Sequence, residues 1–292
     1  MSPIVFQLGP LTIAWYGVLI AAALVIGTAI AGRLAARRGM NPDAVIDGVL
    51  WLTIAGIVGA RIGYVATNLN QYWDDPVRVL TIWEGGLSFH GIFLLALPVL
   101  WWFSRARGLN PWAYLDVLMP GLAMGIIGGR IGNFMNGTDS LGRLTSLPIG
   151  FTWPDTAPAY FGIVATVGAP GPMHLTQIYG ALIGAVLLIL AWRWLSAGRW
   201  PGYVFWQFVL WYSALRFVFE ETFRLNPLYL NVINQNSPDQ LGIGFFTLTH
   251  LVSIPLIALA IWMLRRGAEA EAAGEDEAAP APAPAHGRRQ AP

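Results

Sequence analysis

Three arginines and one glutamate lie within or at the ends of long apolar stretches of this sequence: Arg61, Arg130, Arg216 and Glu220. An ionisable side chain at membrane depth costs several kcal/mol and therefore usually has a function. The alternative is a structural ion pair, or a side chain that reaches out to the lipid headgroups. Because a guanidinium forms paired hydrogen bonds with phosphate, three such arginines favour a site for an anion such as a phospholipid headgroup.

Arg216 and Glu220 are four residues apart, so on an α-helix they share one face. They could form an ordinary salt bridge, or Glu220 could hold Arg216 in position for a ligand, and the two interpretations are compatible. Arg224 continues the same face one turn on. Glu221 faces another direction, and we expect it to be a solvated residue at the end of a helix.

His90 is the candidate general base of this sequence. It lies beside glycines at the start of an apolar stretch, close to the predicted arginine site, and imidazole accepts a proton near neutral pH. A lone histidine in this setting could also be a hydrogen-bonded residue of the membrane interface. His174 and His250 are weaker candidates.

Several kinds of site find no support in the sequence. The chain has no cysteine, so a disulfide or thiolate metal site is excluded and any thiol in the chemistry must come from a substrate. No two histidines have metal-ligand spacing, and no glycine-rich nucleotide motif is present. We therefore expect no metal and no cofactor, and the net charge of +1 gives no indication of a nucleic-acid partner.

The composition indicates that these residues are positioned by membrane-spanning helices. The chain is 55% hydrophobic and 11% charged, whereas soluble domains have about 25% charged residues. A spanning helix needs about 20 mostly apolar residues. We predict an all-α polytopic membrane protein with about seven transmembrane helices, at Leu11–Gly32, Ala44–Ala66, Leu87–Phe103, Trp112–Phe134, Leu175–Leu195, Tyr203–Thr222 and Gly242–Leu264.

These helices form one predicted transmembrane domain over residues 1–266, with a long apolar loop at about 135–174 on its outer face. At the Gly85–Gly86 pair before the third span, we expect a broken or re-entrant entry of the chain into the membrane. Residues 267–292 are rich in Ala, Pro and Glu, and we predict a disordered, low-complexity cytoplasmic tail.

The arginines near the ends of the predicted spans orient the chain. If the spans alternate in direction, three arginines lie on one side, namely Arg78, Arg143 and Arg224. Nine lie on the other: Arg33, Arg37, Arg38, Arg105, Arg107, Arg193, Arg199, Arg265 and Arg266. Because cytoplasmic loops are enriched in Arg and Lys, we expect the N-terminus outside and the C-terminus in the cytoplasm.

The stretch Gly129–Gly137, followed by Gly142 and Arg143, closely resembles the signature of the phosphatidylglycerol–prolipoprotein diacylglyceryl transferases. Further segments resemble the same family in the same order: Trp15–Gly17, Gly59–Tyr64, Gly85–Gly91, and Arg216 with Glu220 and Phe223–Arg224. The resemblance covers roughly residues 3–265. It implies the seven-helix fold with its N-terminus outside, in the cytoplasmic membrane of a bacterial cell.

The resemblance also implies the reaction. A diacylglyceryl group would pass from phosphatidylglycerol to the lipobox cysteine of a preprolipoprotein, with glycerol phosphate released. Arg130 and Arg216 would clamp the phosphate, and His90 would be a candidate base for the thiol. Tyr16 and Asn133 would form hydrogen bonds with the headgroup.

The same resemblance assigns further residues to the substrate site. Gly142 would let the outer loop turn close to the substrate, and Arg143 would contact it from that loop. Arg61 and Glu220 would support the arginines that bind the phosphate. Asn136 belongs to the signature itself.

Two carboxylates of the family pattern are missing. Thr138 stands where the family has a glutamate, and Asp139 is the residue that could replace it one position later. In the segment His174–Gly180, Leu175 replaces a proline and Gly180 replaces a second glutamate. We therefore also consider a divergent lipid-binding paralogue that is non-catalytic or has a changed specificity.

A third hypothesis is a membrane transporter of an anionic substrate. It requires a path through the membrane with polar residues on the cytoplasmic side. Asp47 and Asp116 are the candidates there, although both could simply lie near helix ends.

Overall fold

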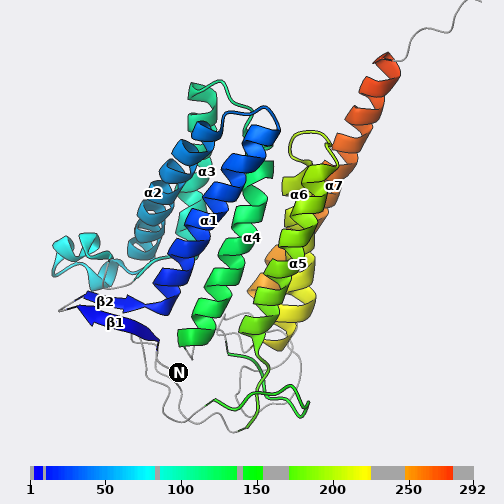
Figure 1. Ribbon diagram of the computed structural model, residues 1–292. Coiled ribbons are helices and arrows are strands. Elements are labelled where there is room, and N and C mark those ends of the chain that lie inside the picture. Colours follow the sequence, from blue (N-terminus) through cyan, green and yellow to red (C-terminus); the bar gives the residue numbers. More distant parts are fainter. Residues whose placement is uncertain are drawn as a thin grey trace, which may run out of the picture.

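The computed structural model describes residues 3–8, 11–82, 86–136, 141–153, 171–224 and 247–278, and of His90 it describes the main chain only. These residues form a bundle of seven α-helices with a small β-hairpin at one end (Figure 1). The helices are α1 (Trp15–Arg37), α2 (Pro42–Thr67), α3 (Phe89–Ala106), α4 (Pro111–Asn136), α5 (Thr176–Ser196), α6 (Tyr203–Leu215) and α7 (Leu248–Ala278).

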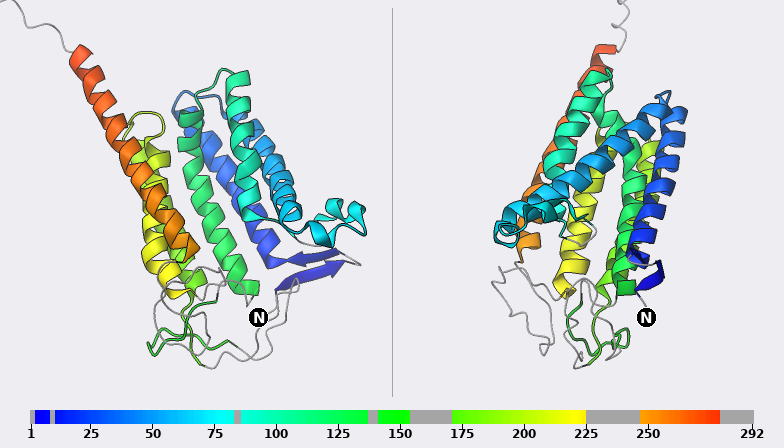
Figure 2. Two further views of the ribbon diagram at one scale, coloured as in Figure 1. Left: turned by 180° about the vertical axis from the view of Figure 1, so that it is seen from behind. Right: turned by 90° about the vertical axis from the view of Figure 1, so that its left-hand side faces the viewer.

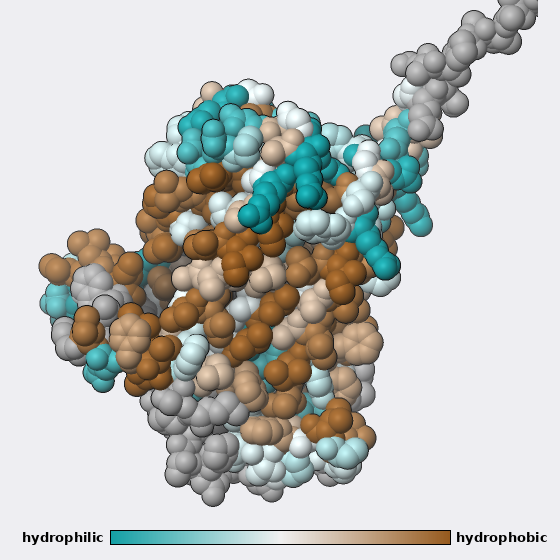
Figure 3. Space-filling model, in the orientation of Figure 1, coloured by the Kyte–Doolittle hydropathy of each residue, from teal (hydrophilic) through white to brown (hydrophobic). Residues whose placement is uncertain are grey.

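Five of these helices are long and apolar enough to cross a membrane: α1, α2, α4, α5 and α7. The apolar part of α3 is shorter, Leu94–Ala106. After α6 the chain continues through a π-helical turn, η4 (Arg216–Glu220), and a 3-10 turn, η5 (Glu221–Phe223). On the face shown in Figure 3, apolar side chains cover the middle of the bundle, as expected for a helical membrane protein.

The first helix begins later than we predicted. Leu11–Ala14 is not helical but forms strand β2, which pairs antiparallel with β1 (Ile4–Leu8) and places Gln7 opposite Thr12. The physical reason lies in the residues Gly9 and Pro10, which are typical of a turn, and in the β-branched residues around them. The sequence pattern did not indicate the hairpin, because its apolar residues continue directly into those of the helix.

The predicted disordered tail is wrong for residues 267–278, because α7 continues to Ala278. Ala and Glu are strong helix formers, so this stretch extends a helix that has already begun. An ion pair of 2.8 Å between Nη1 of Arg199 and Oε2 of Glu271 joins the extension to the connection between α5 and α6. The predicted tail residues 279–292 lie outside the described part of the chain.

Glycines bring the helices close together. A Cβ atom on Gly27 of α1 would lie 2.8 Å from the Cα atom of Gly121 in α4. A Cβ atom on Gly59 of α2 would lie 2.4 Å from the carbonyl oxygen of Gly91 in α3. Such contacts are typical of membrane helices, where small residues allow the backbones to pack closely. Helix α4 also packs against α5, so the helices that carry the candidate site are neighbours.

One end of the bundle carries the additional structure. The β-hairpin, the segment 68–82 with its 3-10 turns η1 (Leu69–Gln71) and η2 (Pro76–Leu80), and residues 141–153 all lie there (Figures 1 and 2). The connections between α1 and α2, α3 and α4, and α5 and α6 lie at the opposite end. The candidate site lies at the first of these ends, where α4 ends and α5 begins.

Candidate anion-binding site

The centre of the site is a buried ion pair between α4 and η4. Nη2 of Arg130 contacts Oε1 of Glu220, and the two side chains are only 11% and 1% exposed. Burying a carboxylate is costly unless a cation compensates for it. Arg130 and Glu220 therefore stabilise each other, and the pair joins the fourth and sixth helices.

Helix α5 provides the surface on which this pair lies. A Cβ atom on Gly180 would be 2.7 Å from Nε of Arg130, 2.8 Å from its Cδ and 2.9 Å from Oε2 of Glu220. Atoms at such distances overlap. The missing side chain of Gly180 thus leaves the space that the Arg130–Glu220 pair occupies.

Arg216 lies at the start of the π-helical turn that ends at Glu220. Its Nη1 donates a hydrogen bond of 2.9 Å to the hydroxyl of Tyr212, while its Nε is buried without a hydrogen-bond partner in the described residues. Glu220 was expected on the same helix face as Arg216, but its ion pair is with Arg130. Residues four apart also lie on nearly one face of a π turn, and Glu220 stays within electrostatic range of Arg216.

Arg224 adds a third positive charge to the cluster. It lies within electrostatic range of Arg130 and Arg216 and of the carboxylates of Glu220 and Glu221. Burial, with the like charge of Arg130, lowers the pKa of Arg224. Three guanidinium groups therefore face two carboxylates among the described residues, which gives the site an excess of positive charge suited to an anion.

Main-chain hydrogen bonds of isolated β-bridges connect the segments around the cluster. The N–H of Arg143 donates to the carbonyl of Phe223 at 2.8 Å, and the N–H of His174 donates to the carbonyl of Arg143 at 2.9 Å. Gly142 fits beside His174 only because it has no side chain, since its Cβ would lie 2.0 Å from the carbonyl oxygen of His174. We expected Gly142 to allow a turn near the substrate, whereas the structure gives this close approach of two main-chain segments as the reason for a glycine.

The side chain of Arg143 is almost completely buried, at 1% exposure. None of its three guanidinium nitrogens has a hydrogen-bond partner within the described residues. Burial lowers the pKa of Arg143. A buried cation is costly without a partner, and none of the described residues supplies one through these nitrogens.

The polar residues expected around the phosphate lie near the same end of α4. Tyr16, in the first turn of α1, packs on α4 so closely that a Cβ atom on Gly132 would lie 2.7 Å from its ring. Asn133 is half-buried one turn after Arg130, and Asn136 is 9% exposed at the end of the helix. The structure thus brings Tyr16, Asn133 and Asn136 to the helix end that carries Arg130.

The guanidinium of Arg61 forms hydrogen bonds with nearby main-chain carbonyl groups. Its Nε donates to the carbonyl of Val79 at 2.8 Å, its Nη1 donates to that of Gly86 at 3.0 Å, and its Nη2 donates to that of Arg78. Its guanidinium also lies 5.3 Å from the ring centre of Tyr72. Arg61 therefore holds the segment 68–82 and the entry to α3 against α2.

Two expected site residues are not described. Asp139 and the side chain of His90 lie outside the described part of the chain, as does Thr138. The structure therefore gives no position for the candidate base or for the proposed substitute carboxylate.

The prediction that Glu221 is a solvated residue is wrong. Its side chain is 0% exposed, and its Oε1 accepts a hydrogen bond of 3.0 Å from the hydroxyl of Thr247. Thr247 in turn contacts His250, which is also fully buried. The sequence signal for this contact is a pair of polar residues, Thr247 and His250, three positions apart in an apolar stretch.

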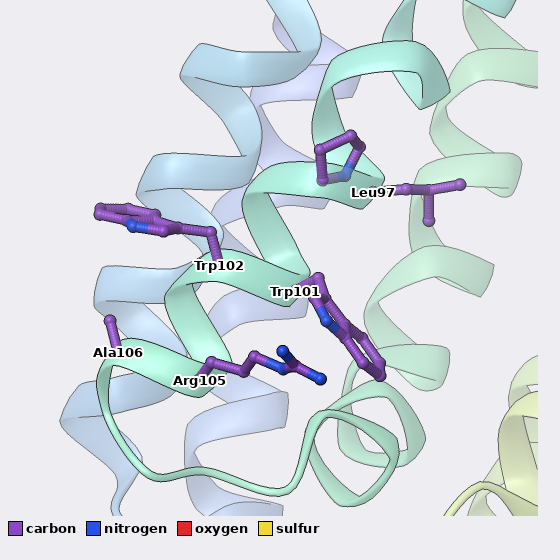
Figure 4. A pocket seen from close by; sticks show the side chains of 6 residues that line it. Leu97, Trp101, Trp102, Arg105 and Ala106 are labelled. Atoms are coloured by element: carbon purple, nitrogen blue, oxygen red, sulfur yellow. The ribbon is translucent and has the colours of Figure 1, made fainter.

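The carboxylates considered for a transport path have structural partners. Asp116 of α4 accepts the main-chain N–H groups of Gly202 and Phe205 at 2.8 Å each and so caps the start of α6. Asp47 forms an ion pair of 2.9 Å with Arg107. Both contacts lie at the end opposite the arginine cluster, as does a cavity near the end of α3 lined by Trp101, Trp102 and Arg105 (Figure 4).

The chain is similar to known proteins over most of its length. Residues 3–266 match the model of a family described as prolipoprotein diacylglyceryl transferase. A phosphatidylglycerol–prolipoprotein diacylglyceryl transferase of Thermus thermophilus is 48% identical over 91% of this chain and 99% of its own length. One of the same name from Deinococcus radiodurans is 39% identical over 91% of this chain and 85% of its own.

Proposed function

The chain belongs to the prolipoprotein diacylglyceryl transferase family, and we propose that its arginine site transfers a diacylglyceryl group from phosphatidylglycerol to the lipobox cysteine of a preprolipoprotein. The observation that carries this proposal is the buried cluster of Arg130, Arg216 and Arg224 around only two carboxylates among the described residues. Phosphatidylglycerol brings a phosphate to the membrane surface, which is the ligand that such a cluster favours.

In the proposed reaction the cysteine thiolate attacks a glycerol carbon of phosphatidylglycerol. A C–S bond forms, the C–O bond to the phosphate breaks, and glycerol phosphate leaves with the electron pair. Arg130 and Arg216 stabilise the negative charge that develops on the leaving phosphate. Glu220 keeps Arg130 in place through their buried ion pair.

The thiol must lose its proton before it attacks, since the thiolate is the nucleophile and a free cysteine has a pKa of about 8.5. We propose that His90, near the start of α3, accepts this proton. Tyr16, Asn133 and Asn136 are proposed to bind the headgroup, and Arg143 to contact the anion from the loop side. Arg61 supports the site indirectly, through the segment that it fastens.

We propose that all seven helices span the cytoplasmic membrane of a bacterium, with the N-terminus outside and the C-terminus in the cytoplasm. The arginine site then lies in the outer half of the bilayer. The nine arginines at the other end of the bundle support this orientation, because positive residues are enriched on the cytoplasmic side.

The decisive experiment uses purified protein in micelles with phosphatidylglycerol and a synthetic lipobox peptide. Mass spectrometry should detect a diacylglyceryl group on the peptide cysteine and released glycerol phosphate. Arg130→Ala and Arg216→Ala should abolish the product, and Arg33→Ala, a change at an exposed position of the other end, should not. Normal turnover in either site variant would refute the phosphate clamp.

The divergent paralogue is the second candidate, because Thr138 and Gly180 replace two carboxylates of the family pattern. The same assay separates the two functions. A folded, lipid-binding protein that gives no adduct would be the paralogue. If Asp139 replaces the missing glutamate, Asp139→Ala should be severely impaired and Asp139→Glu much less so.

A further inference from the structure

The beginning of α7 contains a fully buried chain of polar groups that none of the proposed roles explains. Thr247, His250 and Glu221 are each 0% exposed. The hydroxyl of Thr247 donates to Oε1 of Glu221 at 3.0 Å and accepts the main-chain N–H of His250 at 3.4 Å, so Thr247 also caps the helix. This chain of contacts links α7 to the segment that follows Arg216.

The Nε2 atom of His250 carries a proton. It lies 3.1 Å from the carbonyl oxygen of Phe217, which can only accept, so Nε2 donates to it. The Nδ1 atom lies 3.2 Å from the main-chain nitrogen of Thr247 and 3.0 Å from its hydroxyl oxygen. The ring also stands edge-on to that of Phe217, with 4.4 Å between their centres. His250 thus contacts both the main chain and the side chain of Phe217.

Phe217 is the second residue of the π-helical turn η4. In this turn the N–H of Glu221 bonds to the carbonyl of Arg216, five residues back. The carbonyl of Phe217 accepts from two side chains, Nε2 of His250 at 3.1 Å and the hydroxyl of Thr222 at 2.9 Å. Single π turns within helices are rare, and they are frequent at functional sites.

The turn held in this way places the two charged groups of the site. Arg216 begins η4 and Glu220 ends it. Glu220 forms its ion pair with Arg130, and Nη1 of Arg216 donates to Tyr212. A π turn and an α turn rotate successive residues by different angles, so a return to an ordinary α-helix would turn Arg216 and Glu220 relative to each other.

We propose that His250 is a positioning residue, which holds the π turn through the Phe217 carbonyl and so sets Arg216 and Glu220 for the transfer. This inference rests on the proposed function. It predicts that His250 acts on the transition state, because the geometry of the arginines matters most while charge develops on the phosphate. Loss of the hydrogen bond should therefore lower kcat with little change in KM.

The test measures kcat and KM for phosphatidylglycerol in the micelle assay, together with the melting temperature of each purified variant. His250→Leu replaces the imidazole by an apolar side chain of similar bulk that has no hydrogen-bond donor. Its kcat should fall by about 10²-fold, as expected for a displacement of about 1 Å. His250→Gln supplies an amide N–H for the Phe217 carbonyl and should retain most of the activity. Ser253→Ala is the matched control, because Ser253 is buried on the same helix and its hydroxyl donates to the carbonyl of Thr249, one turn earlier.

Thr222→Val keeps the test decisive if His250→Leu does not fold. It removes the other donor to the Phe217 carbonyl without changing the shape of the side chain, and it should lower kcat in the same way. Wild-type kcat in both variants, or equal losses in His250→Gln and His250→Leu, would overturn the inference. An inactive wild-type protein would instead refute the proposed function.

Discussion

Gly180→Ala tests the geometry of the site with a single methyl group. The added Cβ would lie 2.7 Å from Nε of Arg130, whereas ordinary contacts begin at 3.4 Å. The Arg130 side chain must therefore retreat by about 0.7 Å, the difference between these two distances. Misplacement by about 1 Å can cost about 10²-fold in rate, so kcat/KM should fall by that order, which corresponds to about 2.7 kcal/mol.

The stability of this variant should change much less than its activity. Arg130 is a flexible side chain that can move, and alanine favours a helix over glycine by about 1 kcal/mol. We expect a melting temperature close to that of the wild-type protein. This combination separates a displaced arginine from a damaged bundle.

The assay is transfer to the lipobox peptide, with Gly125→Ala as the control. Gly125 lies on α4, and a Cβ atom added there would meet nothing within 4 Å, so the same change at this position should leave the activity intact. Wild-type kcat/KM in Gly180→Ala would refute the reasoning that this glycine positions Arg130.

Three further predictions concern Arg143, Gly142 and His174, in the loop segments beside the arginine cluster. Arg143→Leu should leave the melting temperature unchanged or raise it, because it removes a buried cation without a described partner, and it should raise KM for phosphatidylglycerol. Gly142→Ala should lower the melting temperature, because its Cβ would meet the carbonyl of His174 at 2.0 Å and neither backbone can yield cheaply. Burial lowers the pKa of His174, so the unfolded chain binds more protons below pH about 6.5. The melting temperature should therefore fall as the pH drops through that value, and less so in His174→Gln.

The helices and the principal charges could be predicted from the sequence. Long apolar stretches mark membrane helices because the bilayer requires them, and an arginine inside such a stretch stands out at once. Arg130, Arg216 and Glu220 were found in this way, and the structure brings all three together. The β-hairpin was missed because its strands are as apolar as the helix that follows.

The remaining features depend on contacts between helices, which a single sequence does not display. Glu221 was expected to be solvated because α-helical spacing points it away from Arg216. The π turn changes that spacing and buries it against Thr247. His250 looked like a weak candidate base, whereas its main contact is with a carbonyl on another helix.

Gly180 shows why a missing family carboxylate does not by itself imply a lost activity. A side chain at this position would enter the space that Arg130 and Glu220 already fill, and a glutamate there would bring a second negative charge close to Oε2 of Glu220. With glycine, Glu220 pairs with Arg130, and the three guanidinium groups still outnumber the two carboxylates of Glu220 and Glu221 among the described residues. A phosphate clamp needs this excess of positive charge. Glycine in place of the family glutamate at position 180 is therefore consistent with an active transferase, in which the Arg130–Glu220 ion pair lies against the backbone of α5.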